Sequence, residues 1–182
     1  MITKFNLYEK LNHSIDSFFV ESVLNKKPKF LYHLTSGEDF RKIEKDGLKI
    51  EYSKQHQFVQ GIYLSNSIYI SATYRYDKKD SKIIEIPFSN LNEKYMKPDD
   101  WELFQMVNDD WDDLKEYFDI ENGKDVMSDR DNQIIWENLD YRHSLYICEQ
   151  MIYTKNISPD LFSKVYDMET DLDPNKPNYG IY

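Results

Sequence analysis

The sequence predicts an α+β fold built as one domain. Its 182 residues are enough for a single sizeable core, and 15 tyrosines and 10 phenylalanines favour aromatic packing within it. Short apolar runs typical of strands alternate with longer segments whose apolar residues recur at helical spacing. We divide the chain into an N-terminal helical extension (residues 1–29), a main domain (30–168) and a loosely held tail (169–182).

The first elements have clear boundaries. In the N-terminal extension, Phe18 and Phe19 belong to a helical repeat that ends at Pro28. Residues 30–34 predict the first strand. Ser36 then caps a helix that Gly47 ends. The alternation over 48–50 predicts a short strand.

The segment 61–76 predicts a strand, a tight turn and a helix. Gly61 permits a close approach of backbone, and Asn66 is the expected N-cap of the helix. Ser71 and Tyr74 share one face of that helix with a further serine. Such a corner can hold a flat ligand, but an ordinary corner packed with aromatic side chains explains the same pattern.

The second half of the chain continues the mixed pattern. Residues 82–87 predict a strand that a proline ends. Residues 146–153 and 162–168 are also expected to be strands, and residues 100–118 and 131–139 are expected to be helices.

Composition excludes several classes of protein. The net charge of −10 opposes tight non-specific binding to nucleic acid. A single cysteine excludes an internal disulfide, and the four histidines lack the spacing of a metal site, so we expect no metal. The sequence shows neither an apolar run long enough for a membrane span nor a signal peptide. We therefore expect a soluble, cytoplasmic protein.

Acidic residues are concentrated between Asp99 and Asp140. This block holds fifteen acidic residues against Lys115, Lys124 and Arg130. It is either the solvated face of two helices, a docking surface for a basic partner, or a mimic of a phosphate backbone.

Two ionisable residues stand out from their predicted strands. His33 lies near the end of the first strand, where a hydrogen-bonded structural role is the alternative to a functional one. Glu149 lies within an apolar run, and burying an unpaired carboxylate is costly. It should therefore line a cleft or pair with Arg142 or His143. Cys148 has no base beside it in the sequence and is expected to contribute packing only.

Four motifs follow one another along residues 30–168. They are His33-Leu34-Thr35, Gly61-Ile62-Tyr63-Leu64-Ser65, Ser71-Ala72-Thr73-Tyr74 and Glu149-Gln150-Met151-Ile152-Tyr153. In this order they resemble the ADP-ribosyltransferase superfamily, specifically the branch with a His-Tyr-Glu triad that includes diphtheria toxin and the poly(ADP-ribose) polymerases. The second and third motifs keep the spacing of the polymerases without a gap.

Two positions differ from motifs found in this superfamily. Leu34 replaces a glycine that is usual in this branch, which bears on how closely the backbone approaches nicotinamide. Ile147 stands where arginine-modifying toxins carry a second acidic or amide residue, so the resemblance does not extend to them.

The resemblance implies a split β-sandwich, with two packed, curved sheets around an NAD cleft and flanking helices. It also implies that Glu149, His33 and Tyr63 are catalytic. His33 would bind the adenosine ribose, the Leu34 backbone would hold the nicotinamide amide, and Glu149 would bind the nicotinamide ribose and stabilise the transition state. The remaining cofactor-binding positions implied are Thr35, Gly61, Ser71, which would donate to the carboxamide, and Tyr74, which would stack on the nicotinamide ring.

The implied activity is transfer of one ADP-ribose unit from NAD to an acceptor, most simply a protein, in a bacterial or phage effector, toxin or inhibitor. One alternative is an inactive fold that binds a partner through residues 99–140, which reversing the charge of Asp109 and Asp112 would weaken. Another is modification of, or phosphate transfer from, nucleic acid. A basic rim formed by Lys54, Arg75, Lys78 and Lys79 would favour this last activity.

Overall fold

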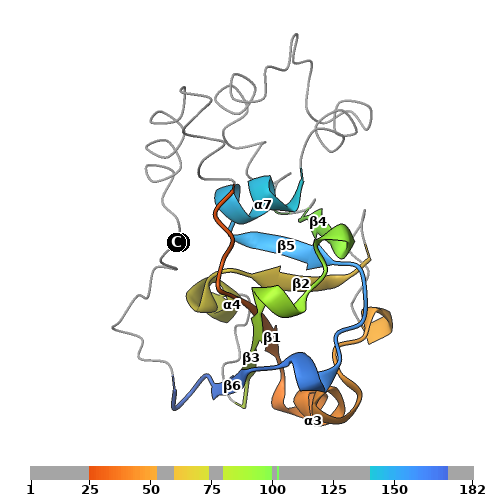
Figure 1. Ribbon diagram of the computed structural model, residues 1–182. Coiled ribbons are helices and arrows are strands. Elements are labelled where there is room, and N and C mark those ends of the chain that lie inside the picture. Colours follow the sequence, from red (N-terminus) through yellow and green to blue (C-terminus); the bar gives the residue numbers. More distant parts are fainter. Residues whose placement is uncertain (1–24, 53–59, 74–79, 100–101, 103–139, 172–182) are drawn as a thin grey trace, which may run out of the picture.

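The computed structural model describes residues 25–52, 60–73, 80–99, 102 and 140–171 (Figure 1). These residues form a mixed α/β structure around an antiparallel six-stranded sheet with the strand order β4-β5-β2-β1-β3-β6. The general prediction of an α+β fold is therefore confirmed. The strands are β1 (Phe30–Thr35), β2 (Ile62–Ser65), β3 (Lys82–Pro87), β4 (Met96–Pro98), β5 (Gln150–Tyr153) and β6 (Lys164–Asp167). The helices are α3 (Gly37–Asp46), α4 (Ile68–Thr73) and α7 (Tyr141–Ile147).

The sheet consists of two three-stranded halves with a narrow junction. β1 pairs with β3 along its whole length, and β2 pairs with β5 along its whole length. Between β1 and β2, the only opposed residues in the ladder are Tyr32 and Ser65. This pair joins the described strands into one sheet, whereas two packed sheets were expected.

Helix α3 begins and ends where its sequence predicts. The Ser36 hydroxyl accepts a hydrogen bond from the Asp39 amide at 3.0 Å, which satisfies a free donor of the first turn. Gly47 follows the last turn with a φ of 79°, where a side chain would be strained. A Cβ atom there would also lie 2.2 Å from the Ile157 carbonyl oxygen, so glycine is required at this position.

The predicted short strand over 48–50 is present only as one bridge. Leu48 pairs with Ile157, and a 3₁₀ turn begins at Ile50. Pro159–Leu161 form a 3₁₀ turn. The other 3₁₀ turns are Phe88–Asn90 and Glu93–Tyr95.

The prediction of a strand over 146–153 is wrong in its first half. Tyr141–Ile147 form helix α7, Glu149 has a φ of 59°, and β5 begins only at Gln150. Asp140 starts the helix because its carboxylate accepts the Arg142 amide at 2.8 Å and the His143 amide at 3.4 Å. A short buried apolar run does not by itself distinguish a helix from a strand.

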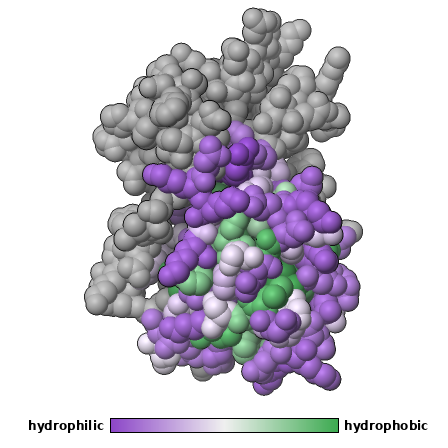
Figure 2. Space-filling view, in the orientation of Figure 1, coloured by the Kyte–Doolittle hydropathy of each residue, from purple (hydrophilic) through white to green (hydrophobic). Residues whose placement is uncertain are grey.

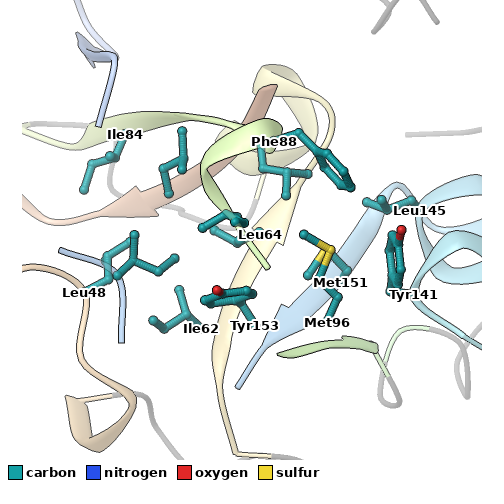
Figure 3. Close-up of a cluster of buried hydrophobic side chains, with 14 of the residues drawn as sticks. Leu48, Ile62, Leu64, Ile84, Phe88, Met96, Tyr141, Leu145, Met151 and Tyr153 are labelled. Atoms are coloured by element: carbon teal, nitrogen blue, oxygen red, sulfur yellow. The ribbon is translucent and has the colours of Figure 1, made fainter. Parts of the chain in front are cut away.

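The main core lies on one face of the sheet. Leu64 and Met151 lie at its centre, with Ile84 of β3 on one side and Tyr141 and Leu145 of α7 on the other (Figure 3). Helix α7 packs on β4 and β5, and α4 packs on β1, β2 and β3 (Figure 1). Figure 2 shows apolar side chains gathered in the middle of the described surface, surrounded by hydrophilic ones.

Several predictions lie outside the described residues. They concern nearly all of the N-terminal extension and the tail, the helices over 100–118 and 131–139, and most of the acidic block between Asp99 and Asp140. At the ends of that block, Asp99 is buried and Asp140 caps α7. In the described part of the chain, no helix is both long and apolar enough to cross a membrane.

Substitutions of Asp140 test the cap of α7. Burial alone would raise the pKa of Asp140, but hydrogen bonds from His143 and Arg142 outweigh burial and hold that pKa below its ordinary 3.8. The charged form is therefore favoured by folding, and its contribution is present above pH 3.8 and lost as the pH falls further. We expect Asp140→Ala to lower the free energy of unfolding at pH 7 by about 1 kcal/mol.

The matched variant Asp140→Asn keeps a capping oxygen but removes the charge. Its unfolding free energy should lie between those of Asp140→Ala and the unaltered chain at pH 7, and the difference from the unaltered chain should shrink below pH 3.8. Urea unfolding at pH 7 and at acidic pH measures both quantities. A difference that stays constant with pH would contradict the role given to the charge.

Candidate functional site

Four parts of the chain meet at the junction of the two halves of the sheet. Ser65, the last residue of β2, is opposite Tyr32 of β1 on one side and Gln150 of β5 on the other. The turn into α4 follows Ser65 directly, and the turn out of α7 precedes Gln150. Residues that are more than 100 positions apart in the sequence, such as Tyr32 and Gln150, therefore flank one serine.

His33 follows Tyr32, the one residue of β1 that lies opposite a residue of β2 in the ladder. Its Nδ1 atom is 2.9 Å from the Tyr63 carbonyl oxygen, so the imidazole connects the two halves just beyond the Tyr32–Ser65 pair. A carbonyl oxygen only accepts hydrogen bonds, so Nδ1 carries the proton in this contact. In a neutral ring the lone pair is then on Nε2, which fits His33 to accept a hydrogen bond from a hydroxyl group.

Glu149 lies in the turn between α7 and β5, and not inside a strand as predicted. Its carbonyl oxygen accepts the Ser65 hydroxyl at 2.8 Å and the Asn66 amide at 3.1 Å. Its φ of 59° is in the left-handed region, which is costly for a residue other than glycine. Backbone strain of this kind is concentrated at functional sites.

The partners that the sequence offered for Glu149 have other contacts. The Arg142 guanidinium donates to the Asp140 carboxylate at 2.7 Å, and the His143 ring lies 3.0 Å from the same carboxylate. Both side chains therefore support the start of α7.

The Tyr63 side chain belongs to the other face of β2 from the main core. Tyr63 is opposite Ile152 in the β2–β5 ladder, whereas its neighbour Leu64 belongs to the core. His33 is opposite Ile84, which also belongs to the core. Strand alternation thus places the His33 side chain on the core face of the sheet and the Tyr63 side chain on the opposite face. The imidazole contacts the backbone of Tyr63, not its ring.

Ser71 is buried on α4, and its hydroxyl lies 3.5 Å from the Tyr32 carbonyl oxygen. This is the long limit of a hydrogen bond, so the contact is weak. Leu34 and Thr35 continue the β1–β3 ladder, opposite Ile83 and Lys82. Ser71, Leu34 and Thr35 therefore lie on elements that flank the junction.

Gly61 has a packing role in the structure, and its contact with a ligand stays a prediction. A Cβ atom at this position would lie 2.3 Å from Ile152 Cγ2 and 2.9 Å from the Tyr153 carbonyl oxygen. Glycine therefore allows β2 to approach β5. The helix after β2 begins at Ile68, and the Asn66 side chain, which was the expected cap, donates to the Leu145 carbonyl at 3.2 Å.

Sequence reasoning missed a buried carboxylate beside the junction. Glu85 is only 7% exposed and accepts hydrogen bonds from Ser163 Oγ at 2.7 Å and from the Tyr166 hydroxyl at 2.8 Å. Burial, together with the charge and hydrogen bond of Glu85, raises the pKa of Tyr32 to about 12. The signal in the sequence was a glutamate within the apolar strand 82–87.

Other predicted residues add little to the site. Cys148 is buried, and burial raises the pKa of its thiol, as suits a packing residue. Tyr74, together with the proposed basic rim of Lys54, Arg75, Lys78 and Lys79, lies outside the described residues. Over the described ranges, no group of three or more His, Cys, Asp or Glu side chains is placed to hold a metal ion.

In comparisons with protein-family models, with curated proteins and with solved structures, nothing matched this chain.

The variant Gly61→Ala tests the packing role of this glycine. The added methyl group meets β5 too closely, so we expect the free energy of unfolding to fall by roughly 1–3 kcal/mol. Denaturant unfolding measures this loss. The control is Ser89→Ala, at an exposed position, which should change stability by less than about 0.5 kcal/mol. Unchanged stability in Gly61→Ala would contradict the packing role.

Proposed function

We propose that this protein is an NAD-dependent ADP-ribosyltransferase that transfers one ADP-ribose unit to an acceptor, most simply a protein, and releases nicotinamide. The observation that carries the proposal is a pair of contacts at the junction of β1, β2 and β5. The His33 ring contacts the Tyr63 carbonyl oxygen, and Ser65, two residues further along β2, holds the Glu149 carbonyl oxygen. The motifs of His33, Tyr63 and Glu149 are far apart in the sequence, yet all three lie next to the single pair that joins the halves of the sheet.

Tyr63 takes part through its main chain in this proposal. Strand alternation places the His33 and Tyr63 side chains on opposite faces of the sheet, while the His33 ring contacts the Tyr63 carbonyl oxygen. A ligand bound at the imidazole therefore meets the main chain of Tyr63 and not its ring.

His33 binds the adenosine ribose in this proposal. With the proton on Nδ1 held by the Tyr63 carbonyl, Nε2 accepts a hydrogen bond from a ribose hydroxyl. The same contact fixes the orientation of the ring. On the nicotinamide side, the Leu34 backbone and Ser71 bind the carboxamide. The weak 3.5 Å contact of Ser71 with Tyr32 is easily exchanged for such a partner.

Glu149 acts on the bond that breaks. Its carboxylate accepts a hydrogen bond from the 2′-hydroxyl of the nicotinamide ribose and stabilises positive charge that develops at C1′. The bond between C1′ and the nicotinamide nitrogen breaks, and its electron pair leaves with nicotinamide. A lone pair of the acceptor forms the new bond to C1′, and the acceptor's proton passes to Glu149 or to water.

Glu149→Gln tests this function because it keeps the shape of the side chain and removes the charge. We expect nicotinamide release to fall by about 10²–10³-fold, as for loss of one preorganised electrostatic group. Binding of NAD, measured by titration calorimetry on the full chain, should change only a few-fold. The matched control is Glu169→Gln, at an exposed position after β6, which should leave both quantities unchanged.

Two results would reject the proposed function. One is the absence of NAD binding to the unaltered chain at millimolar concentrations of NAD. The other is nicotinamide release by Glu149→Gln at the rate of the unaltered chain.

A further inference from the structure

We propose that Ser65 is the positioning residue for Glu149, a role that rests on the proposed function. Its hydroxyl holds the Glu149 carbonyl, and this contact keeps Glu149 in the left-handed conformation that directs its carboxylate toward the NAD site.

The conformation of Glu149 requires support from outside its own turn. A glutamate with a φ of 59° is strained, and such strain persists only where surrounding contacts determine it. Two donors from the β2–α4 turn bind its carbonyl oxygen, the Ser65 hydroxyl at 2.8 Å and the Asn66 amide at 3.1 Å. The Asn66 side chain further ties this turn to α7 through the Leu145 carbonyl.

Ser65 is itself held firmly. It is 4% exposed and lies opposite both Tyr32 and Gln150 in the sheet. Its oxygen accepts the Ser67 amide at 3.0 Å. Its single proton has two acceptors in reach, and the Glu149 carbonyl at 2.8 Å is nearer than the Ser67 carbonyl at 3.0 Å. The hydroxyl therefore connects the start of α4 with Glu149.

Loss of this hydroxyl should affect chemistry more than binding. A change of φ at residue 149 from the left-handed to the ordinary negative range turns the Cα–Cβ bond and moves the carboxylate. The contacts of His33 with NAD do not depend on that movement. Ser65 therefore acts through Glu149 on the transition state, which changes kcat with little change in KM.

The first test compares Ser65→Ala with Ser65→Thr, which retains a hydroxyl. We expect Ser65→Ala to lower kcat for nicotinamide release by about tenfold or more, with KM within about twofold of the unaltered chain. Ser65→Thr should recover most of kcat. In the double variant Ser65→Ala with Glu149→Gln, the serine change should cost little further activity, because its partner is already disabled.

The matched control is Ser81→Ala, which also removes a buried serine hydroxyl but lies immediately before β3, in a different part of the chain from Glu149. It should lower thermal stability without changing kcat. Equal losses of kcat in Ser65→Ala and Ser81→Ala, or an unchanged kcat in Ser65→Ala, would overturn the proposal.

A readout that needs no activity separates this proposal from the proposed function. The scalar coupling between the amide and Hα protons of Glu149, measured by NMR on the full chain, reports its φ. We expect Ser65→Ala to shift this coupling and Ser65→Thr to preserve it. An unchanged coupling in Ser65→Ala overturns the positioning role, whereas the absence of nicotinamide release by the unaltered chain overturns the enzymatic role.

Discussion

The pairing of Tyr32 with Ser65 is the constraint on which the arrangement of the described residues depends. It is the single opposed pair between β1 and β2, and it joins two halves that are each paired along whole strands. No further pair is opposed in this ladder, and the His33 ring instead reaches the Tyr63 carbonyl. A polar side chain thus supplies a further contact between β1 and β2.

Ser65 also determines where Glu149 lies. It is opposite Gln150 as well as Tyr32, so the start of β5, and with it Glu149, is held beside the junction. Local structure supports the position of Glu149. The Asp140 cap starts α7, and this helix leads directly into the strained turn that contains Glu149. The preceding helix α7, the Ser65–Gln150 pair and the Ser65 hydroxyl therefore all act on the position of Glu149.

The sequence predicted well those features that short-range chemistry controls. The strands over 30–34 and 82–87 and the helix between Ser36 and Gly47 follow from patterns and caps that operate within a few residues. The helix over 141–147 was missed because its last residues, Tyr146 and Ile147, are apolar and continue towards β5 as one apparent strand. The role of Gly61 and the hydroxyl contact of Ser65 depend on β5, which is far away in the sequence, and periodicity does not report such contacts.

The central claim is that His33, Tyr63 and Glu149 line one NAD site at this junction. The most direct measurement is an NMR titration of the full chain with NAD, followed through the backbone amide signals. The account predicts concentration-dependent shifts at residues 33–35, 63–67 and 149, with small changes along β6. Shifts confined to other parts of the chain, or none at these positions up to millimolar NAD, would contradict it.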